Sequence, residues 1–379
     1  MDAALWERAG LYDPLDPASA ERLALLEYLT RRGATVEQMV EAHRMGTLPG
    51  VAGNLVTQGK TPMATVKDIA EQSGMSLTRV LRALLAAGIP AAPDTEVAAE
   101  LVRLMDAFEQ GASLLGDEAT LAFTRVLGAS AMNIAEAAVA LFFAELGPGT
   151  VREGPDELER ARLAEAATTA FTAVPDVLTR MVMDAFERAQ RRAQEARSWL
   201  APFDADAAEY EGSTEVVALG FVDLVGSTAW AQSVNLREQN LALTRFESAA
   251  WSSAVLAGGR VVKTIGDEVF FTAPTAEAAC RIGIEVCRAA ADDPVLPPAR
   301  GAVGIGPAIA REGDYFGPLV NLLARLAKAG APGELVVTEA VTADLAPDVW
   351  ALEPLELADL RGITGPVRAF TVEPRPGTA

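Results

Sequence analysis

Two aspartates stand where β-rich segments end, and their carboxylates are suited to hold a metal ion. Asp223 closes the apolar run GFVD and is followed by a Gly-Ser-Thr turn and a helical pattern from about Ala229. Asp267 lies in a Gly-Asp turn between the runs RVVKTI and EVFFTA, a pattern typical of a β-hairpin. If the two turns belong to adjacent strands of one sheet, Asp223 and Asp267 form an oxygen-only site for Mg²⁺ or Mn²⁺. Free N–H groups at the start of the helix after Asp223 suit a polyphosphate bound beside that metal.

A lysine shares the hairpin with the second aspartate. Lys263 lies four residues before Asp267. One interpretation is a plain surface ion pair between them, which contributes only about 0–1 kcal/mol. The other is that the two side chains serve separate chemical roles.

A third stretch combines polar residues with an apolar helix. The segment REGDYFGPLVNLLARLAKAG, residues 311–330, contains Asp314, then Asn321 and Arg325 within a helical pattern that starts near Leu319. Residues four apart lie on one helix face, so Asn321 and Arg325 are neighbours. Because burying an amide and a guanidinium is costly without polar partners, we expect something polar to dock there.

The composition argues against several classes of protein. The chain has 379 residues, of which 50% are hydrophobic, so we expect a folded protein of two or three domains. It has one histidine, His43, near a predicted helix end, which leaves a single candidate for any histidine-based catalysis or zinc site. The two cysteines, Cys280 and Cys287, lack zinc-ligand spacing and are predicted to be buried, reduced thiols.

The charge argues against a nucleic-acid partner. The formal net charge is −20, which repels a polyanion. Residues 62–90 nevertheless have the length and turn of a helix-turn-helix, and its second helix offers Arg79 and Arg82. Because Asp68 and Glu71 lie in the same segment and the surrounding chain is acidic, we favour structural use of this motif in a helical bundle; a transcription regulator is the alternative.

Neither a membrane span nor an export signal is evident. The longest apolar run, residues 137–144, falls short of the roughly 20 residues that a spanning helix needs. The N-terminal residues MDAALWERAG lack the basic and apolar regions of a signal peptide. We therefore expect a cytoplasmic protein.

The chain divides into a helical half and an α/β half. Capping-box patterns begin at Thr35 and Thr65, and helical periodicity fills residues 118–146 and 156–198, with a break or kink at Pro175. From Val216 onward, β-rich segments alternate with helical ones. The predicted organisation is an α+β chain: an all-α helical bundle over residues 1–200, a linker over 201–214 and an α/β domain over 215–379.

The three polar stretches together resemble the catalytic domain of class III nucleotidyl cyclases. The family pattern F-x-D-x-x-G-[FS]-T matches GFVDLVGST and implies that Asp223 is the first metal ligand. The pattern K-T-I-G-D implies a base-reading role for Lys263 and a second metal-ligand role for Asp267. The resemblance covers about residues 214–374 and implies a ferredoxin-like fold.

The rest of the resemblance concerns the third stretch. The family run D-x-x-G-x-x-x-N-x-x-x-R implies that Asp314 reads the base and that Asn321 and Arg325 act on the transition state. Arg361, in the closing segment LRGITG, is a looser candidate for phosphate contact. In this family the site forms between two subunits arranged head to tail, one supplying the metal aspartates and the other the lysine, asparagine and arginine. Lys263 and Asp267 of one chain are then expected to serve different sites of a homodimer.

The resemblance implies an adenylate cyclase that binds two divalent metal ions per site, Mg²⁺ or Mn²⁺, and converts ATP to cyclic AMP and pyrophosphate. Lys263 and Asp314 match the hydrogen-bonding pattern of adenine, which guanine reverses. Cytosine also presents an amino donor beside a ring acceptor, so a cyclase for another nucleotide is one alternative. A non-enzymatic nucleotide-binding signalling protein is the other. The helical half resembles, more weakly, the regulatory domains of some actinobacterial cyclases, which implies that it controls the catalytic domains.

Overall fold

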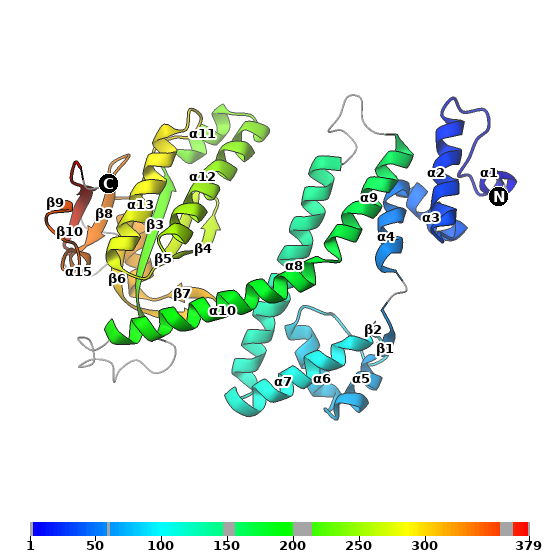
Figure 1. Ribbon diagram of the computed structural model, residues 1–379, viewed down its shortest axis with the longest axis horizontal. Helices are drawn as coiled ribbons and strands as arrows, with labels where there is room; N and C mark the ends of the chain where they lie inside the picture. Colours follow the sequence, from blue (N-terminus) through cyan, green and yellow to red (C-terminus); the bar gives the residue numbers. More distant parts are fainter. Residues whose placement is uncertain (1–2, 59–60, 147–155, 200–213, 357–366, 378–379) are drawn as a thin grey trace. The chain divides into compact units, whose positions relative to one another are not determined.

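The computed structural model describes residues 3–58, 61–146, 156–199, 214–356 and 367–377 (Figure 1). Its contacts divide the chain into two compact units, residues 1–184 and 185–379. The expected linker at 201–214 falls almost wholly outside the described residues, so the domain limits given above stay predictions.

The first unit is built mainly from helices. Its helices are α1 (Ala3–Arg8), α2 (Ser19–Arg31), α3 (Val36–Arg44), α4 (Val51–Thr57), α5 (Val66–Ser73), α6 (Leu77–Ala86), α7 (Val102–Leu115), α8 (Asp117–Leu146), α9 (Glu157–Phe171) and the first part of α10 (Val174–Trp199). Two short 3₁₀ turns and a pair of three-residue strands, β1 (Met63–Thr65) and β2 (Glu96–Ala98), complete it. Among the described residues, no helix has both the length and the apolar character needed to cross a bilayer.

Local sequence signals explain where these helices start. Thr35 and Thr65 each form a capping box. The threonine side chain accepts a hydrogen bond from the backbone N–H of the third helical residue, which is Gln38 or Asp68. The side chain of that third residue accepts a hydrogen bond from the backbone N–H of the threonine. Pro175 stands in the first turn of α10, where its missing N–H costs nothing, and the helical pattern breaks just before it. The predicted capping boxes and the break near Pro175 are therefore confirmed.

The helix-turn-helix segment uses its arginines inside the first unit. Helices α5 and α6 are joined at Gly74, whose φ of 69° is left-handed. Arg79 forms ion pairs with Glu109 at 2.6 Å and Asp117 at 2.7 Å, and Arg82 lies 3.4 Å from Glu118. These contacts tie α6 to α7 and α8.

The second unit contains one large sheet. Its strands are β3 (Thr214–Leu224), β4 (Arg260–Ile265), β5 (Glu268–Ala273), β6 (Ala299–Arg311), β7 (Asp314–Phe316), β8 (Leu335–Thr338), β9 (Trp350–Leu355) and β10 (Ala369–Pro374). They lie in the order β4-β5-β3-β6-β8-β10-β9, with β7 paired to β6. The helices are α11 (Ser227–Ser233), α12 (Leu236–Leu256), α13 (Ala276–Asp292), α14 (Pro318–Leu326) and α15 (Glu339–Thr342).

The first four strands of this sheet form a ferredoxin-like core. They run antiparallel in the order β4-β5-β3-β6, with α12 between β3 and β4 and α13 between β5 and β6. Residues of α12 and α13 share one apolar cluster on one face of the sheet, and residues of α14 share another cluster on the opposite face. The predicted α+β fold is confirmed, with a helical N-terminal region followed by a ferredoxin-like domain. The prediction of an all-α bundle is wrong in one detail, because β1 and β2 pair within the N-terminal region.

Side-chain alternation along β3 decides where Asp223 points. Val222 and Leu224 belong to the cluster with α12 and α13, whereas Leu219 and Phe221 belong to the cluster with α14. Since successive side chains of a strand point to opposite faces, Asp223 shares the α14 face with Phe221.

The two cysteines lie in the apolar cluster of α13. Cys280 and Cys287 are both buried free thiols, as predicted. Burial disfavours the charged thiolate and raises the pKa of each thiol to about 12.

Close packing at Gly220 gives a stability prediction. Gly220 in β3 lies directly across from Phe271, and a Cβ added there would come within 2.2 Å of the buried Phe271 ring. We expect Gly220→Ala to lower the stability of residues 185–379 by about 1–3 kcal/mol, because the ring must move within a filled core. Calorimetry of the full chain should show that transition at lower temperature. Gly306→Ala is the matched control, because its Cβ would meet only Leu319 at an ordinary 3.6 Å; an equal effect there would contradict the explanation.

Candidate active site

Asp223 and Asp267 line one hollow on the second unit. Asp223 is the penultimate residue of β3, and Asp267 belongs to the two-residue turn between β4 and β5. The turn follows the predicted hairpin, with Gly266 at a left-handed φ of 66°. Because β5 lies beside β3, with Asp223 opposite Glu268, the turn brings Asp267 next to the end of β3. The residues that line the hollow are Asp223, Leu224, Gly226, Ser227, Thr228, Ile265, Asp267, Glu268, Arg300 and Lys328.

Three carboxylates and two cations set the electrostatics of this hollow. Asp223 is only 7% exposed, and burial raises its pKa, with Asp267 adding repulsion. Arg300 opposes this shift, with its Nε 3.2 Å from Asp223 Oδ1. Burial likewise raises the pKa of Glu268, and Lys328 opposes it across 3.5 Å. The carboxylates outnumber the cations, so an additional positive charge would relieve their repulsion.

The donor set of the hollow fits a divalent metal ion. Asp223 and Asp267 offer hard oxygen ligands that repel each other without a cation between them. Among the described residues, no group of three or more His, Cys, Asp or Glu side chains forms a potential metal cage. Two carboxylates suit Mg²⁺ or Mn²⁺ when substrate phosphates and water complete the coordination.

The turn after Asp223 forms part of the wall of the same hollow. Gly226 adopts a left-handed φ of 69° and precedes α11, which begins at Ser227 rather than near Ala229 as expected. Ser227 and Thr228, the first two helical residues, therefore lie in the wall of the hollow.

Lys263 forms its ion pair with Asp314 and not with Asp267. The ammonium group of Lys263 on β4 contacts Asp314 Oδ2 at the start of β7. It also lies 5.8 Å from the centre of the Phe270 ring and 5.9 Å from that of Phe316. Both charged side chains remain partly open to solvent, at 41% and 22% exposure, so a ligand can reach them.

Asn321 and Arg325 lie one turn apart on α14. Leu323 and Leu326 of this helix are buried against the sheet, while Asn321 is exposed and Arg325 is half-buried. Within the described ranges, neither polar side chain has a hydrogen bond or an ion pair. Both are available to a group from outside this chain.

The candidate residues therefore fall into separate places on one chain. The hollow brings Asp223 and Asp267 together, and Lys263, Asp314, Asn321 and Arg325 are not among the residues that line it. Arg361 lies outside the described residues.

Three residues of the hollow did not emerge from the sequence: Glu268, Arg300 and Lys328. Arg300 stands directly opposite Asp223 in the pairing of β3 with β6, a register that no local pattern reveals. Glu268 follows Asp267 directly, and that adjacency was the one available signal.

Comparisons with known proteins agree with this picture. No family model matches the chain. An uncharacterized protein of Mycobacterium tuberculosis is 30% identical over 380 residues, covering 99% of this chain and 95% of that protein. A pH-sensitive adenylate cyclase of Mycobacterium tuberculosis is 27% identical over 94% of this chain and 88% of its own length. An adenylate cyclase of Glutamicibacter nicotianae is 38% identical over 157 residues, which are 41% of this chain and 39% of that enzyme.

The relatives that are named adenylate cyclases support the assignment of this chain to the lyases. The chain belongs to the class III nucleotidyl cyclases, and two of the relatives match it along nearly its whole length, including the helical half.

Proposed function

We propose that this protein is an adenylate cyclase that converts ATP to 3′,5′-cyclic AMP and pyrophosphate at composite sites of a head-to-tail homodimer. The observation that carries the proposal is the separation of its polar groups into a carboxylate hollow and a distinct Lys263–Asp314 pair. A site divided between two subunits requires such a separation. The adenylate cyclases among the relatives support the choice of reaction.

The metal-binding part of the proposal rests on the donor set of the hollow. Asp223 and Asp267 would hold two divalent ions, Mg²⁺ or Mn²⁺, which when bound supply activation of the ribose 3′-hydroxyl and neutralisation of the triphosphate. Arg300 holds the Asp223 carboxylate in place through its 3.2 Å contact.

The remaining chemistry belongs to the side chains of the chain itself. The 3′-hydroxyl oxygen bonds to the α-phosphorus and its proton passes to water, while the bond between the α-phosphorus and the leaving pyrophosphate breaks, so negative charge gathers on the phosphoryl oxygens. Arg325, which has no carboxylate partner within the described ranges, stabilises that charge. Asn321, one turn away, orients the ribose, and positioning of this kind supplies much of the catalysis of phosphoryl transfer.

The Lys263–Asp314 pair supports the choice of adenine. Lysine can only donate, which suits adenine N1, and the carboxylate accepts from the exocyclic amino group at C6. Guanine presents the reverse pattern at these positions and would leave both groups of the pair mismatched. Cytosine shares the pattern of adenine, so a pyrimidine nucleotide is the second candidate substrate.

We further propose that the helical unit regulates the catalytic unit through α10. The support is sequence order: α10 ends at Trp199, shortly before β3, which carries Asp223.

Product analysis tests these proposals together. The purified full chain and a fragment of residues 205–379 are incubated with Mn²⁺ and ATP, GTP, CTP or UTP, and cyclic nucleotide and pyrophosphate are measured by chromatography. We expect cyclic AMP as the main product and a different turnover for the fragment. Another cyclic nucleotide would overturn the base assignment, and no product from either protein would favour a non-enzymatic nucleotide-binding role. Equal turnover and dimer affinity of the two proteins would contradict regulation by the helical unit.

A further inference from the structure

The hairpin that carries Asp314 has a tight and strained tip. Strands β6 and β7 are joined by Glu312 and Gly313, with Arg311 and Asp314 paired across the turn. Both turn residues are left-handed, with φ of 55° at Glu312 and 81° at Gly313. Among the described residues other than glycine, Glu312 is alone in having a positive φ. A glutamate adopts this conformation at a cost, so contacts from elsewhere must hold the tip.

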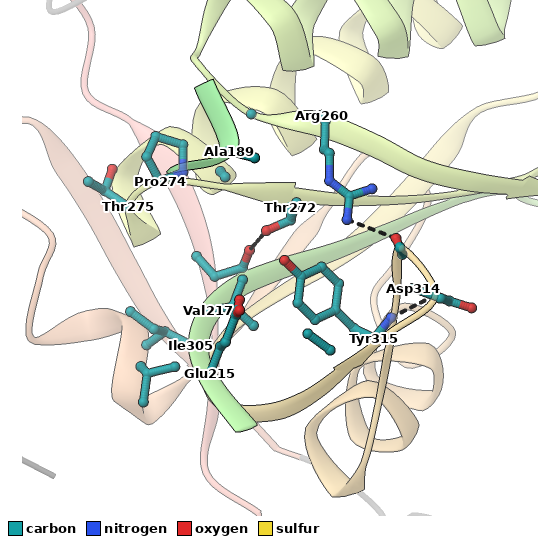
Figure 2. A pocket seen from close by; sticks show the side chains of 16 residues that line it. Ala189, Glu215, Val217, Arg260, Thr272, Pro274, Thr275, Ile305, Asp314 and Tyr315 are labelled. Carbon is teal, nitrogen blue, oxygen red and sulfur yellow. Dashed lines mark hydrogen bonds between the residues drawn. The ribbon is translucent and has the colours of Figure 1, made fainter. Parts of the chain in front are cut away.

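Arg260 supplies two such contacts. Its guanidinium Nη2 donates a hydrogen bond to the carbonyl oxygen of Gly313 at 2.8 Å. The guanidinium carbon also lies 5.6 Å from the centre of the Tyr315 ring, within the range of a cation–π contact. Figure 2 shows Arg260 directed toward the hairpin that carries Asp314 and Tyr315. Arg260 therefore contacts both neighbours of Asp314 in the chain, Gly313 and Tyr315.

Strand β4 thus holds the hairpin at two points. Arg260 holds the backbone of the tip, and Lys263 on the same strand pairs with the Asp314 carboxylate. The carboxylate has a second contact, because its Oδ1 accepts a hydrogen bond from the Tyr315 N–H at 2.8 Å. A rotation of the tip would turn Asp314 away from Lys263.

A cavity lies beside the hairpin, so the contacts of Arg260 contribute more to holding the hairpin tip in place. The cavity has a volume of about 230 Å³ and is lined by the hairpin tip, by Arg260, by residues of β3, β5 and β6 and by Ala189 of α10 (Figure 2). Side chains such as Val217 and Ile305 border this space but do not fill it. Because close packing cannot fix the tip on that side, directed polar contacts must do so.

We propose that Arg260 is the positioning residue for base recognition: it holds the Gly313–Tyr315 backbone so that the Asp314 carboxylate faces the same base as Lys263. This inference rests on the proposed adenylate cyclase function. Arg260 itself touches no reacting atom. Its loss should weaken the reading of adenine while the transition-state groups on α14 stay in place.

Steady-state kinetics of the full chain test this role after the wild type has been assayed with ATP and GTP. We expect Arg260→Ala to raise KM for ATP about tenfold, to change kcat by less than about twofold and to lower the ATP-to-GTP ratio of kcat/KM about tenfold. Arg260→Lys keeps the positive charge but loses the planar guanidinium, so its ATP-to-GTP ratio should lie between those of Arg260→Ala and the wild type. Arg311→Ala is the matched control, because Arg311 lies on the same hairpin, has a side chain that is 68% exposed and forms an ion pair with neighbouring Glu312 across 3.6 Å. Arg311→Ala should have the wild-type values of KM, kcat and the ATP-to-GTP ratio of kcat/KM.

A double substitution separates positioning from general stability. If Arg260 acts through Asp314, adding Arg260→Ala to Asp314→Asn should leave the ATP-to-GTP ratio of Asp314→Asn unchanged. Additive losses, or an unchanged ratio in Arg260→Ala and Arg260→Lys, would overturn the inference while leaving the proposed function intact. A fall in kcat together with a lower melting temperature in both variants would assign Arg260 a structural role instead. A wild-type chain that makes no cyclic AMP would overturn the proposed function and this inference with it.

Discussion

A one-to-one mixture of Asp267→Ala and Lys263→Ala chains is expected to regain about a quarter of wild-type activity, although each variant alone is nearly inactive. Asp267 lies in the carboxylate hollow, and Lys263 pairs with Asp314 outside it. If one subunit supplies the hollow and its partner supplies the lysine, both sites of each variant homodimer are broken. In a heterodimer the two substitutions fall in one site, and the other site is intact.

Cyclic AMP formation by chains mixed after separate purification checks this result, with heterodimers counted by two different affinity tags. The matched control is a mixture of Lys263→Ala with Arg325→Ala. Both of these residues are assigned to the same subunit's share of a site, so every site in that mixture remains broken. Rescue of both mixtures, or of neither with heterodimers present, would mean that the division of residues between subunits is wrong.

The second large effect is expected for Arg325→Ala, which should lower kcat by about 10²–10³-fold and leave KM for ATP nearly unchanged. Arg325 is half-buried on α14, and within the described parts of the chain its side chain has no ion-pair partner. Its charge is free to act on the charge that develops at phosphorus. Because this side chain makes no polar contact with any residue that the structure describes, we expect the melting temperature to stay the same.

Arg288→Ala is the control for the loss of an arginine. Arg288 lies on α13, against the other face of the sheet, and pairs with Glu285 at 2.9 Å. This exposed i,i+3 pair contributes little, so activity and stability should both be retained. A rise in KM alone for Arg325→Ala would make Arg325 a substrate-binding group, and a lower melting temperature would make it structural.

Much of the catalytic fold could be predicted because its signals are local. The Gly-Asp turn between two apolar runs predicts the β4–β5 hairpin, and the structure has it at Gly266 and Asp267. The caps at Thr35 and Thr65 likewise depend on residues only three positions apart. The roles of Asn321 and Arg325 came from the family resemblance, since a helix face alone names no chemistry.

The contacts within the candidate site could not be predicted, because they depend on strand register, which local sequence patterns do not reveal. Arg300 meets Asp223 because β6 pairs with β3 at one register, and a shift of one residue would turn its side chain to the other face. Lys263 and Asp314 are in contact although they are 51 residues apart in the sequence. The register of β4 against β5 shifts between Val261 and Lys263, immediately before this lysine. An irregularity of this kind re-aims a side chain without a sequence signature of its own.

Chemical labelling of the two buried thiols of α13 can report the unfolding of residues 185–379. They are the only cysteines of the sequence, and both belong to residues 185–379. The thiolate is the form of cysteine that attacks a thiol reagent, and it is scarce when the pKa is about 12; the closed core also shields both sulfur atoms. Labelling kinetics would therefore time the opening of the catalytic unit alone, whatever the helical unit is doing, in a chain that needs no added dye or engineered probe.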